Sequence, residues 1–383
     1  MAKSKYLISG IGPGRGGVGA LMQNLTLIAE RNGFHVIANW NGPSLRRLLE
    51  RRHFLQLVKI LTVRLLKRIR FSLASRFVKN SKVIFLHPQT AGFKTLFRLA
   101  EKNELFFYVM DNSFFCIRSY NCHPSTKQEC FLCLGNVENV SSECAPFPIP
   151  MGKKENLNFL KNLQLLAPRI TFLCQNDNQS KLLKMHFGPT TKCKLIGMDT
   201  GELYTWSPKR IPVEKCIDDN PYILFHGTAI EPKGLDYVLR LAERMQAVRF
   251  IIPAPAQDLH SRFIPQNVEC QDVTWLNGLK ELVENASLVL NPSMWSAPIE
   301  GALIKSLAHN PNVATVETRY GYESEIPDEV GLIRLPQDII LASKIIEQFL
   351  DKDGGPMLID TARIKWLKEL NTSNQFERFI SSL

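Results

Sequence analysis

The chain has 383 residues, a formal net charge of +11, and 45% hydrophobic and 22% charged residues. This length favours two domains over a single core, and the composition is that of a folded globular protein, which excludes a disordered or fibrous chain. No apolar run is long enough to span a bilayer, and the short N-terminal apolar run is unlike a signal peptide. We therefore expect a cytoplasmic protein.

The N-terminal segment combines a strand, a glycine loop and a helix. The strand-like run Tyr6–Ser9 is followed by five glycines between positions 12 and 19, and then by a helical segment, Val18–Arg31. The spacing G-x-G-x-x-G occurs twice in this loop, and such loops bring backbone N–H groups to a phosphate. We expect Arg15, Gly16 and Gly17 to face a phosphate-bearing ligand. A glycine turn that only allows close packing of strand and helix is the alternative.

The second strand disfavours a dinucleotide cofactor. The run His35–Ala38 continues into Asn39, Trp40 and Asn41, where a dinucleotide-binding fold places an acidic residue for the ribose. An NAD-dependent oxidoreductase is therefore a poor fit to this sequence.

A basic segment follows, and it accounts for the chain's excess charge. Residues 45–82 contain twelve Lys or Arg and one acid, Glu50. Between residues 51 and 79 the pattern is helical, with an apolar stripe formed by Leu55, Val58, Leu65, Leu66, Ile69 and Leu73. Basic amphipathic helices lie on anionic membrane surfaces. The stripe packing on the domain core is the alternative, and nucleic acid is disfavoured because aromatic residues are sparse and no nucleic-acid motif is present.

Strand-like and helical runs alternate along the rest of the chain. Such alternation predicts parallel sheets covered on both faces, and the runs fall into two groups, so we expect an α/β chain with two Rossmann-like domains. The expected strands are Tyr6–Ser9, His35–Ala38, Val83–Leu86, Leu105–Val109, Ile170–Leu173, Tyr222–Phe225, Arg249–Ile252, Val268–Cys270, Leu288–Leu290 and Asn312–Thr315. The expected divisions are a first domain (1–200) with a Cys-rich insertion (111–150), a linker (201–220), a second domain (221–365) and a C-terminal helix that packs back on the first domain (366–383).

Several segments, in order, resemble the retaining family-four glycosyltransferases of the GT-B fold, the type that builds surface polysaccharides. Phe225–Gly234 resembles that family's strand–loop–Lys-Gly element, and Leu195–Thr200 resembles its Asn-Gly-Val-Asp stretch. Asn291–Ser293 and a helix expected over Ala297–His309 occupy the place of its donor-binding loop. The resemblance implies two domains facing an interdomain cleft.

The resemblance also implies roles for individual residues. Lys233 would meet the negative charge that develops on the leaving diphosphate. The family's Arg, five residues earlier, is Thr228 here, and the family's Glu-x7-Glu pair falls on Ala297 and Lys305. Glu300 is then the carboxylate left to contact the donor sugar, with a helix N-terminal carboxylate as its alternative role. The donor-binding set is Arg15, Gly16, Gly17, Gly227, Thr228, Lys233, Ile299, Glu300, Gly301 and Lys305.

His87 and Asp111 each follow an expected strand of the first domain, where ligands of open α/β sheets bind. With Lys233 and Glu300 they form the predicted catalytic set. In the resembling family the leaving phosphate takes the acceptor proton, so neither a dedicated base nor a cofactor is required.

The sequence thus predicts transfer of a sugar from a UDP- or GDP-sugar to a lipid-linked saccharide or another surface-polysaccharide acceptor. The enzyme would be peripheral to the cytoplasmic face of the inner or plasma membrane, attached through residues 51–79, and would not bind nucleic acid. A catalytically weak or inactive binding or scaffold protein is the alternative, because the family's Arg and both of its glutamates are replaced.

Five of the nine cysteines lie between positions 116 and 144. The Cys130-x-x-Cys133 spacing is that of a zinc knuckle, and stable disulfides are rare in the cytoplasm. We expect a structural Zn²⁺ held by Cys116, Cys122, Cys130 and Cys133, with Cys144 or His123 as substitutes. Free thiols or a redox pair are the alternatives.

Overall fold

The computed structural model describes residues 3–14, 17–40, 54–149, 151–198, 221–259, 262–351, 359–372 and 375–383. The first domain contains a sheet built from strands β1 (Lys5–Ser9), β2 (His35–Ala38), β3 (Lys82–Leu86), β4 (Glu104–Tyr108), β5 (Ile170–Cys174) and β6 (Cys193–Leu195). Its order is β2-β1-β3-β4-β5-β6, and neighbouring strands are parallel. Its helices are α1 (Gly17–Arg31), α3 (Phe54–Arg76), α4 (Pro88–Ala91), α5 (Phe93–Lys102), α6 (Lys153–Leu166) and α7 (Asp177–Phe187).

The second domain repeats this plan. Its strands are β7 (Tyr222–Phe225), β8 (Arg249–Ile252), β9 (Val268–Cys270), β10 (Leu288–Asn291), β11 (Val313–Val316) and β12 (Ile333–Leu335). They form a parallel sheet with the order β12-β11-β10-β7-β8-β9. The remaining helices are α8 (Leu235–Arg244), α9 (Leu279–Asn285), α10 (Gly301–His309), α11 (Ile339–Leu350), α12 (Thr361–Thr372) and α13 (Gln375–Ser381). Short 3-10 helices are η1 (Val137–Asn139), η2 (Ala167–Arg169), η4 (Glu231–Lys233), η5 (Ala256–Leu259), η6 (Tyr322–Glu325) and η7 (Asp328–Val330).

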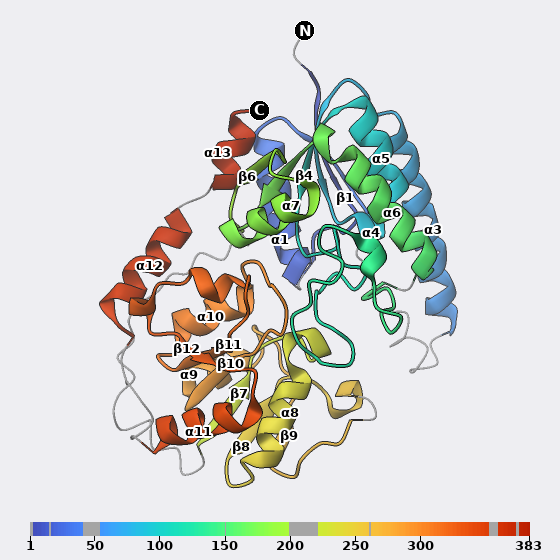
Figure 1. The fold of residues 1–383 in the computed structure, drawn as a ribbon. Coiled ribbons are helices and arrows are strands. Elements are labelled where there is room, and N and C mark those ends of the chain that lie inside the picture. The colour runs from blue at the N-terminus through green and yellow to red at the C-terminus, as the bar shows by residue number, and fades with distance from the viewer. Residues whose placement is uncertain are drawn as a thin grey trace.

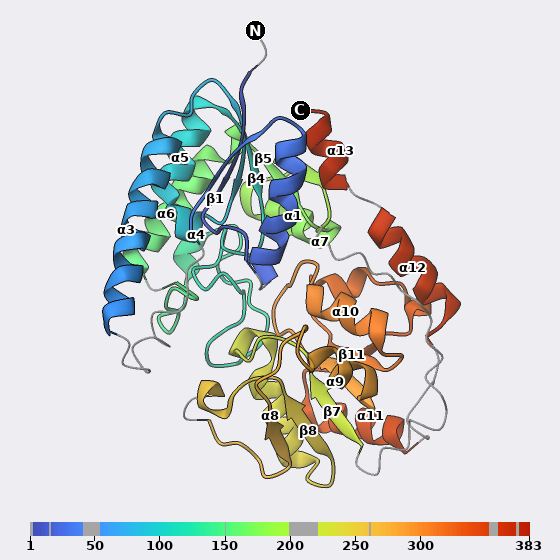
Figure 2. The same ribbon diagram turned by 180° about the vertical axis from the view of Figure 1, so that it is seen from behind.

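Both sheets are covered on two faces, which explains why their central strands are almost continuously apolar. In the first domain, side chains of α1 and α13 pack on one face, and side chains of α5, α6 and α7 pack on the other. Figures 1 and 2 show the two sheets in separate lobes, with α3 at the outer edge of the first. The expected α/β architecture of two parallel-sheet domains is confirmed.

The C-terminal segment links the two lobes, as Figure 2 shows. Helix α12 packs on the second domain, where Leu367 joins a core cluster and Arg363 donates to three backbone carbonyls. Helix α13 instead packs on the first sheet through Phe376, Phe379 and Ile380. Residues 366–372 therefore belong with the second domain, and the part that returns to the first domain is α13.

Helix α3 turns its apolar stripe toward solvent. The six stripe residues are exposed by 47% to 89%: Leu55, Val58, Leu65, Leu66, Ile69 and Leu73. The opposite side of the helix packs inward through Phe71 and Ser75, which are 5% and 0% exposed. This arrangement excludes the alternative in which the stripe packs on the core. Among the described residues, no helix is both long and apolar enough to cross a membrane.

Candidate functional site

The candidate site lies at the carboxyl ends of the central strands of both sheets. His87 follows β3 and Asp111 follows β4, and these strands are neighbours in the middle of the first sheet. Lys233 follows β7 and Ser293 follows β10, the central neighbours of the second sheet. Ligands of open parallel sheets bind at such strand ends, so each domain presents its ligand-binding edge to the same site.

Lys233 and Glu300 form an ion pair in the second domain. The Lys233 ammonium donates to Oε1 of Glu300, and the Ser293 hydroxyl donates to Oε2 at 2.7 Å. Lys233 is placed by the tight turn that ends η4. Gly234 adopts φ +83°, and a Cβ there would lie 2.0 Å from the Pro292 carbonyl oxygen. Only glycine fits position 234, so the backbone requires the glycine that follows Lys233.

Two aromatic rings enclose the Lys233 ammonium. Its Nζ lies 5.0 Å from the centroid of Trp295 and 5.8 Å from that of Tyr120. Tyr120 belongs to the first domain, and its ring meets Trp295 edge-on at 4.7 Å. These distances are those of cation–π contacts, so a first-domain residue covers the cation of the second domain.

The first-domain side of the site is a polar network around Asp111. Gln89 Nε2 donates to both carboxylate oxygens of Asp111, at 3.1 and 3.3 Å, and the Ser113 N–H donates to Oδ1 at 3.0 Å. His87 has a left-handed backbone (φ 57°), and its Nδ1 lies 2.8 Å from the Thr90 hydroxyl. Burial lowers the pKa of His87, although the charge of Asp111 opposes this.

Tyr120 joins the two halves electrostatically. Burial raises its pKa most, and the carboxylates of Asp111 and Glu300 raise it further. Asp111 acts in turn on His87, and Glu300 is bonded to Lys233. Tyr120 therefore lies within electrostatic range of both Asp111 and Glu300, one from each half of the predicted catalytic set.

Further contacts between the domains close this arrangement. Asn121 Nδ2 donates to the Ser296 hydroxyl at 2.8 Å, and the Ser296 N–H donates to Asn121 Oδ1 at 2.9 Å. Arg118 and Lys127 both pair with Glu231, at 2.9 and 2.7 Å. These contacts hold the segment after β4 against the turn that contains Lys233.

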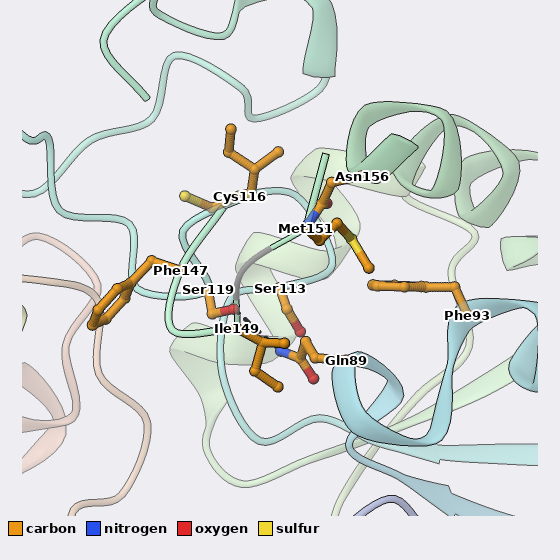
Figure 3. A pocket seen from close by; sticks show the side chains of 10 residues that line it. Gln89, Phe93, Ser113, Cys116, Ser119, Phe147, Ile149, Met151 and Asn156 are labelled. Atoms are coloured by element: carbon orange, nitrogen blue, oxygen red, sulfur yellow. Dashed lines mark hydrogen bonds between the residues drawn. The ribbon is translucent and has the colours of Figure 1, made fainter. Parts of the chain in front are cut away.

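A small cavity of about 10 Å³ lies beside Asp111. Gln89, Ser113 and Ser119 line it together with apolar side chains that include Phe93 and Phe147, as Figure 3 shows. Gln89 Nε2 donates to the Ser119 hydroxyl at 3.2 Å, and Gln89 Oε1 is buried with no hydrogen-bond partner in the described part of the chain. This space holds about one water molecule, so a sugar ring enters only if the lining moves.

The remaining predicted donor residues lie around the same turn and helix. Ile299 is buried and Thr228 is exposed. A Cβ on Gly227 would lie 3.3 Å from the Phe225 ring. The expected helix from Ala297 is wrong in its first turn, because α10 begins at Gly301, after Pro298 and an extended Glu300. Proline favours an extended preceding residue, so Ala297 is disfavoured as a helical residue.

Lys305 lies away from the Lys233–Glu300 pair. Its Nζ is 4.6 Å from the Trp275 centroid, and Trp275 stacks on the buried His226 at 5.7 Å. Burial, followed by the charge of Lys305, lowers the pKa of His226 to about 3. The buried imidazole of His226 is therefore neutral, and it lies against α10 through the Ser306 hydroxyl.

The glycine loop shows close packing. The Gly14 N–H donates to the Gly19 carbonyl at 3.0 Å, and a Cβ on Gly19 would lie 2.9 Å from Gly14 Cα. Gly17 begins α1. Arg15 and Gly16 lie outside the described residues, so their phosphate-binding role stays a prediction.

Five cysteine side chains line a second small cavity, but they divide into two sets. Burial raises the pKa of Cys116, and the nearby thiols of Cys133, Cys144 and Cys130 raise it further. We call these four residues the thiol cluster. Cys122 instead packs in the core of the second domain. Burial raises the pKa of its thiol most, and the charge of Glu231 raises it further. In the described ranges, no three or more His, Cys, Asp or Glu side chains are arranged to hold a metal ion, so zinc stays a prediction.

Tyr120, Trp295, Gln89 and Glu129 were not predicted as site residues. Glu129 accepts bonds from the Ser296 hydroxyl and from two backbone N–H groups, those of Arg319 and Tyr320. The available signal was an aromatic or polar residue next to a predicted strand end, as for Gln89 and Trp295. Tyr120 and Glu129 lie inside the Cys-rich segment, whose position over the second domain is a property of the fold.

No family model and no curated sequence matches this chain. Solved structures match it along its length. Anabaena HepE in complex with UDP and glucose covers 99% of this chain and all of HepE, with a TM-score of 0.61 at 14% identity. Sucrose-phosphate synthase from Thermosynechococcus elongatus matches with a TM-score of 0.57 at 13% identity, covering 99% of this chain and 96% of its own.

A third structure, an α,α-trehalose-phosphate synthase (UDP-forming) from Burkholderia vietnamiensis, gives a TM-score of 0.52 at 11% identity, with coverage of 99% and 96%. At these identities the likeness shows the fold. The chain therefore has the GT-B fold of two Rossmann-like domains, as its sequence led us to expect.

Proposed function

We propose that this protein is a glycosyltransferase that takes its sugar from a UDP- or GDP-sugar. The observation that carries the proposal is Lys233, a half-buried ammonium that follows a central strand of the second sheet and is covered by Tyr120 of the first domain. Breaking the bond between the anomeric carbon and the diphosphate puts negative charge on the leaving oxygens, and a fixed cation stabilises that charge. HepE, which shares the fold, has been captured with UDP-glucose.

The first-domain residues suit the acceptor side of this reaction. Asp111 and His87 follow the central strands of the first sheet, and Asp111 accepts a hydrogen bond from Gln89, which lines the small cavity. We assign them to positioning the acceptor hydroxyl and the reacting sugar. The retaining course belongs to the proposal through the resemblance to family-four enzymes: the acceptor hydroxyl attacks on the face that the diphosphate leaves, and its proton passes to the leaving phosphate.

The proposed acceptor is a lipid-linked saccharide at the cytoplasmic face of a membrane. Helix α3 supports this location, because its apolar stripe is exposed. Residues 54–79 carry seven Lys or Arg and no acid. A protein partner made of a second copy is disfavoured, since seven positive charges would face seven others. An anionic lipid surface satisfies both the apolar stripe and the charge.

The test of the activity is a donor-hydrolysis and transfer screen with a panel of UDP- and GDP-sugars. Lys233→Ala should abolish turnover, whereas Lys344→Ala, which removes an exposed lysine of α11, should leave it unchanged. Near-normal turnover in Lys233→Ala would refute the assignment.

A second candidate is a binding or scaffold protein with the same fold. Glu300 neutralises the Lys233 charge and Tyr120 covers it, so the site is closed in this structure. Calorimetric titration separates the two functions: a scaffold binds no nucleotide sugar of the panel, and an enzyme binds at least one.

A further inference from the structure

The donors around Glu300 resemble an anion-binding site. The carboxylate of Glu300, a group of the protein itself, takes the place of the anion. Glu300 places one carboxylate oxygen on Lys233 and the other on the Ser293 hydroxyl. The side chains of Lys233 and Glu300 are 20% and 13% exposed. An ammonium and a hydroxyl are the donors that phosphate oxygens also take, so the carboxylate sits where an anionic ligand would bind.

A further donor adjoins this site. Trp295 is 2% exposed, and its indole N–H is buried without a hydrogen-bond partner in the described part of the chain. Its ring lies against Lys233. A buried donor without a partner is costly, and this donor belongs to a ring that already contacts the Lys233 ammonium.

Glu300 is poorly suited to hold the donor while it stays in place. Both of its oxygens are engaged by Lys233 and Ser293, and a carboxylate beside a diphosphate repels it. The carboxylate and the diphosphate therefore compete for one cation.

We propose that Glu300 is an internal competitor of the donor's diphosphate. Donor binding moves Lys233 from Glu300 to the diphosphate, and after transfer Glu300 recaptures Lys233 and releases the nucleotide. This exchange rests on the proposed function, and it makes Glu300 a positioning residue that sets donor and product affinity. Its place in the sequence, inside the altered donor loop, makes the competition a feature of this chain.

The exchange is tested by calorimetric titration of the full chain with UDP and, separately, with inorganic pyrophosphate. Glu300→Gln should bind both roughly three to ten times more tightly than the wild type, since a half-buried ion pair no longer competes. Glu243→Gln makes the same charge change at an exposed position of α8 and should leave the affinities unchanged. Lys233→Ala/Glu300→Gln should show no gain over Lys233→Ala.

Affinities that are unchanged or weaker in Glu300→Gln would overturn the exchange, as would a variant that binds neither anion. The proposed function fails in a different way. In one such outcome, Glu300→Gln binds pyrophosphate more tightly, but no nucleotide sugar is bound or hydrolysed. That result would support Glu300 as an internal competitor and refute the glycosyltransferase activity.

Discussion

The exposed stripe of α3 makes a quantitative prediction about membrane binding. Leu65, Leu66 and Ile69 are 60%, 61% and 47% exposed. Full burial of such a side chain contributes about 1.5–3 kcal/mol, so burying the exposed half in a lipid interface contributes about 1 kcal/mol for each. Replacing all three by Gln should weaken binding to vesicles by about 3 kcal/mol, or roughly 100-fold. Gln is a good helix former and the positions are exposed, so the thermal midpoint should change little.

The assay is flotation with vesicles of phosphatidylcholine and phosphatidylglycerol, compared with phosphatidylcholine alone and repeated at high salt. A matched control variant removes as much exposed apolar surface elsewhere, through Leu165→Gln, Phe263→Gln and Leu276→Gln, at positions that are 77%, 74% and 88% exposed. We expect the control to bind as the wild type does, and binding to fall with salt. Equal flotation of the α3 variant and the wild type, or an equal loss in the control, would refute the reasoning.

Three further predictions concern stability and metal. Burial raises the pKa of Glu323 to about 7, although the hydrogen bonds that the Thr318 N–H and hydroxyl donate to its carboxylate lower it. Between about pH 4.5 and 7, Glu323 is therefore protonated in the folded state and ionised in the unfolded chain. The free energy of unfolding falls as pH rises through this range, by on the order of 3 kcal/mol. Urea titrations of Glu323→Gln should show a flatter profile over that range; an identical slope would contradict the assignment. Arg363→Met strands three backbone acceptors that Arg363 now satisfies and should lower the free energy of unfolding by roughly 3 kcal/mol; a loss below about 1 kcal/mol would contradict this. For zinc, we place Cys144 in the expected ligand set in the position first given to Cys122, which packs in the second domain. Protein purified without added metal should then contain about one equivalent, which Cys133→Ser loses and Cys122→Ser keeps; less than half an equivalent in the wild type would end that proposal.

Eight of the ten predicted strands are largely buried, and the edge strands β2 and β9, which are partly exposed, were predicted as well. All ten expected strands are present, with ends that differ by at most one residue. The two that were missed, β6 and β12, are three-residue strands at sheet edges, and each contains a basic residue, Lys194 or Arg334. Short edge strands lack the apolar run on which the prediction depends.

The site was predictable where one domain supplies its residues, and not where the domains meet. Lys233 and Glu300 lie in neighbouring loops of one sheet; the Lys-Gly element pointed to Lys233, and Glu300 was the carboxylate left in the altered donor loop. The contact of Tyr120 with Trp295 joins residues 175 positions apart, in loops of different domains, and no local pattern encodes it. For a similar reason, the sequence did not show which side of α3 packs on the first domain. Phe71 lies off the predicted stripe, and only the packing shows that this second apolar side faces inward.

The most direct test of a donor site at Lys233 is an experimental structure of the full chain with UDP. We predict diphosphate oxygens about 3 Å from Lys233 Nζ, with the Glu300 carboxylate moved off that ammonium. UDP bound elsewhere, with the Lys233–Glu300 pair intact, would contradict it.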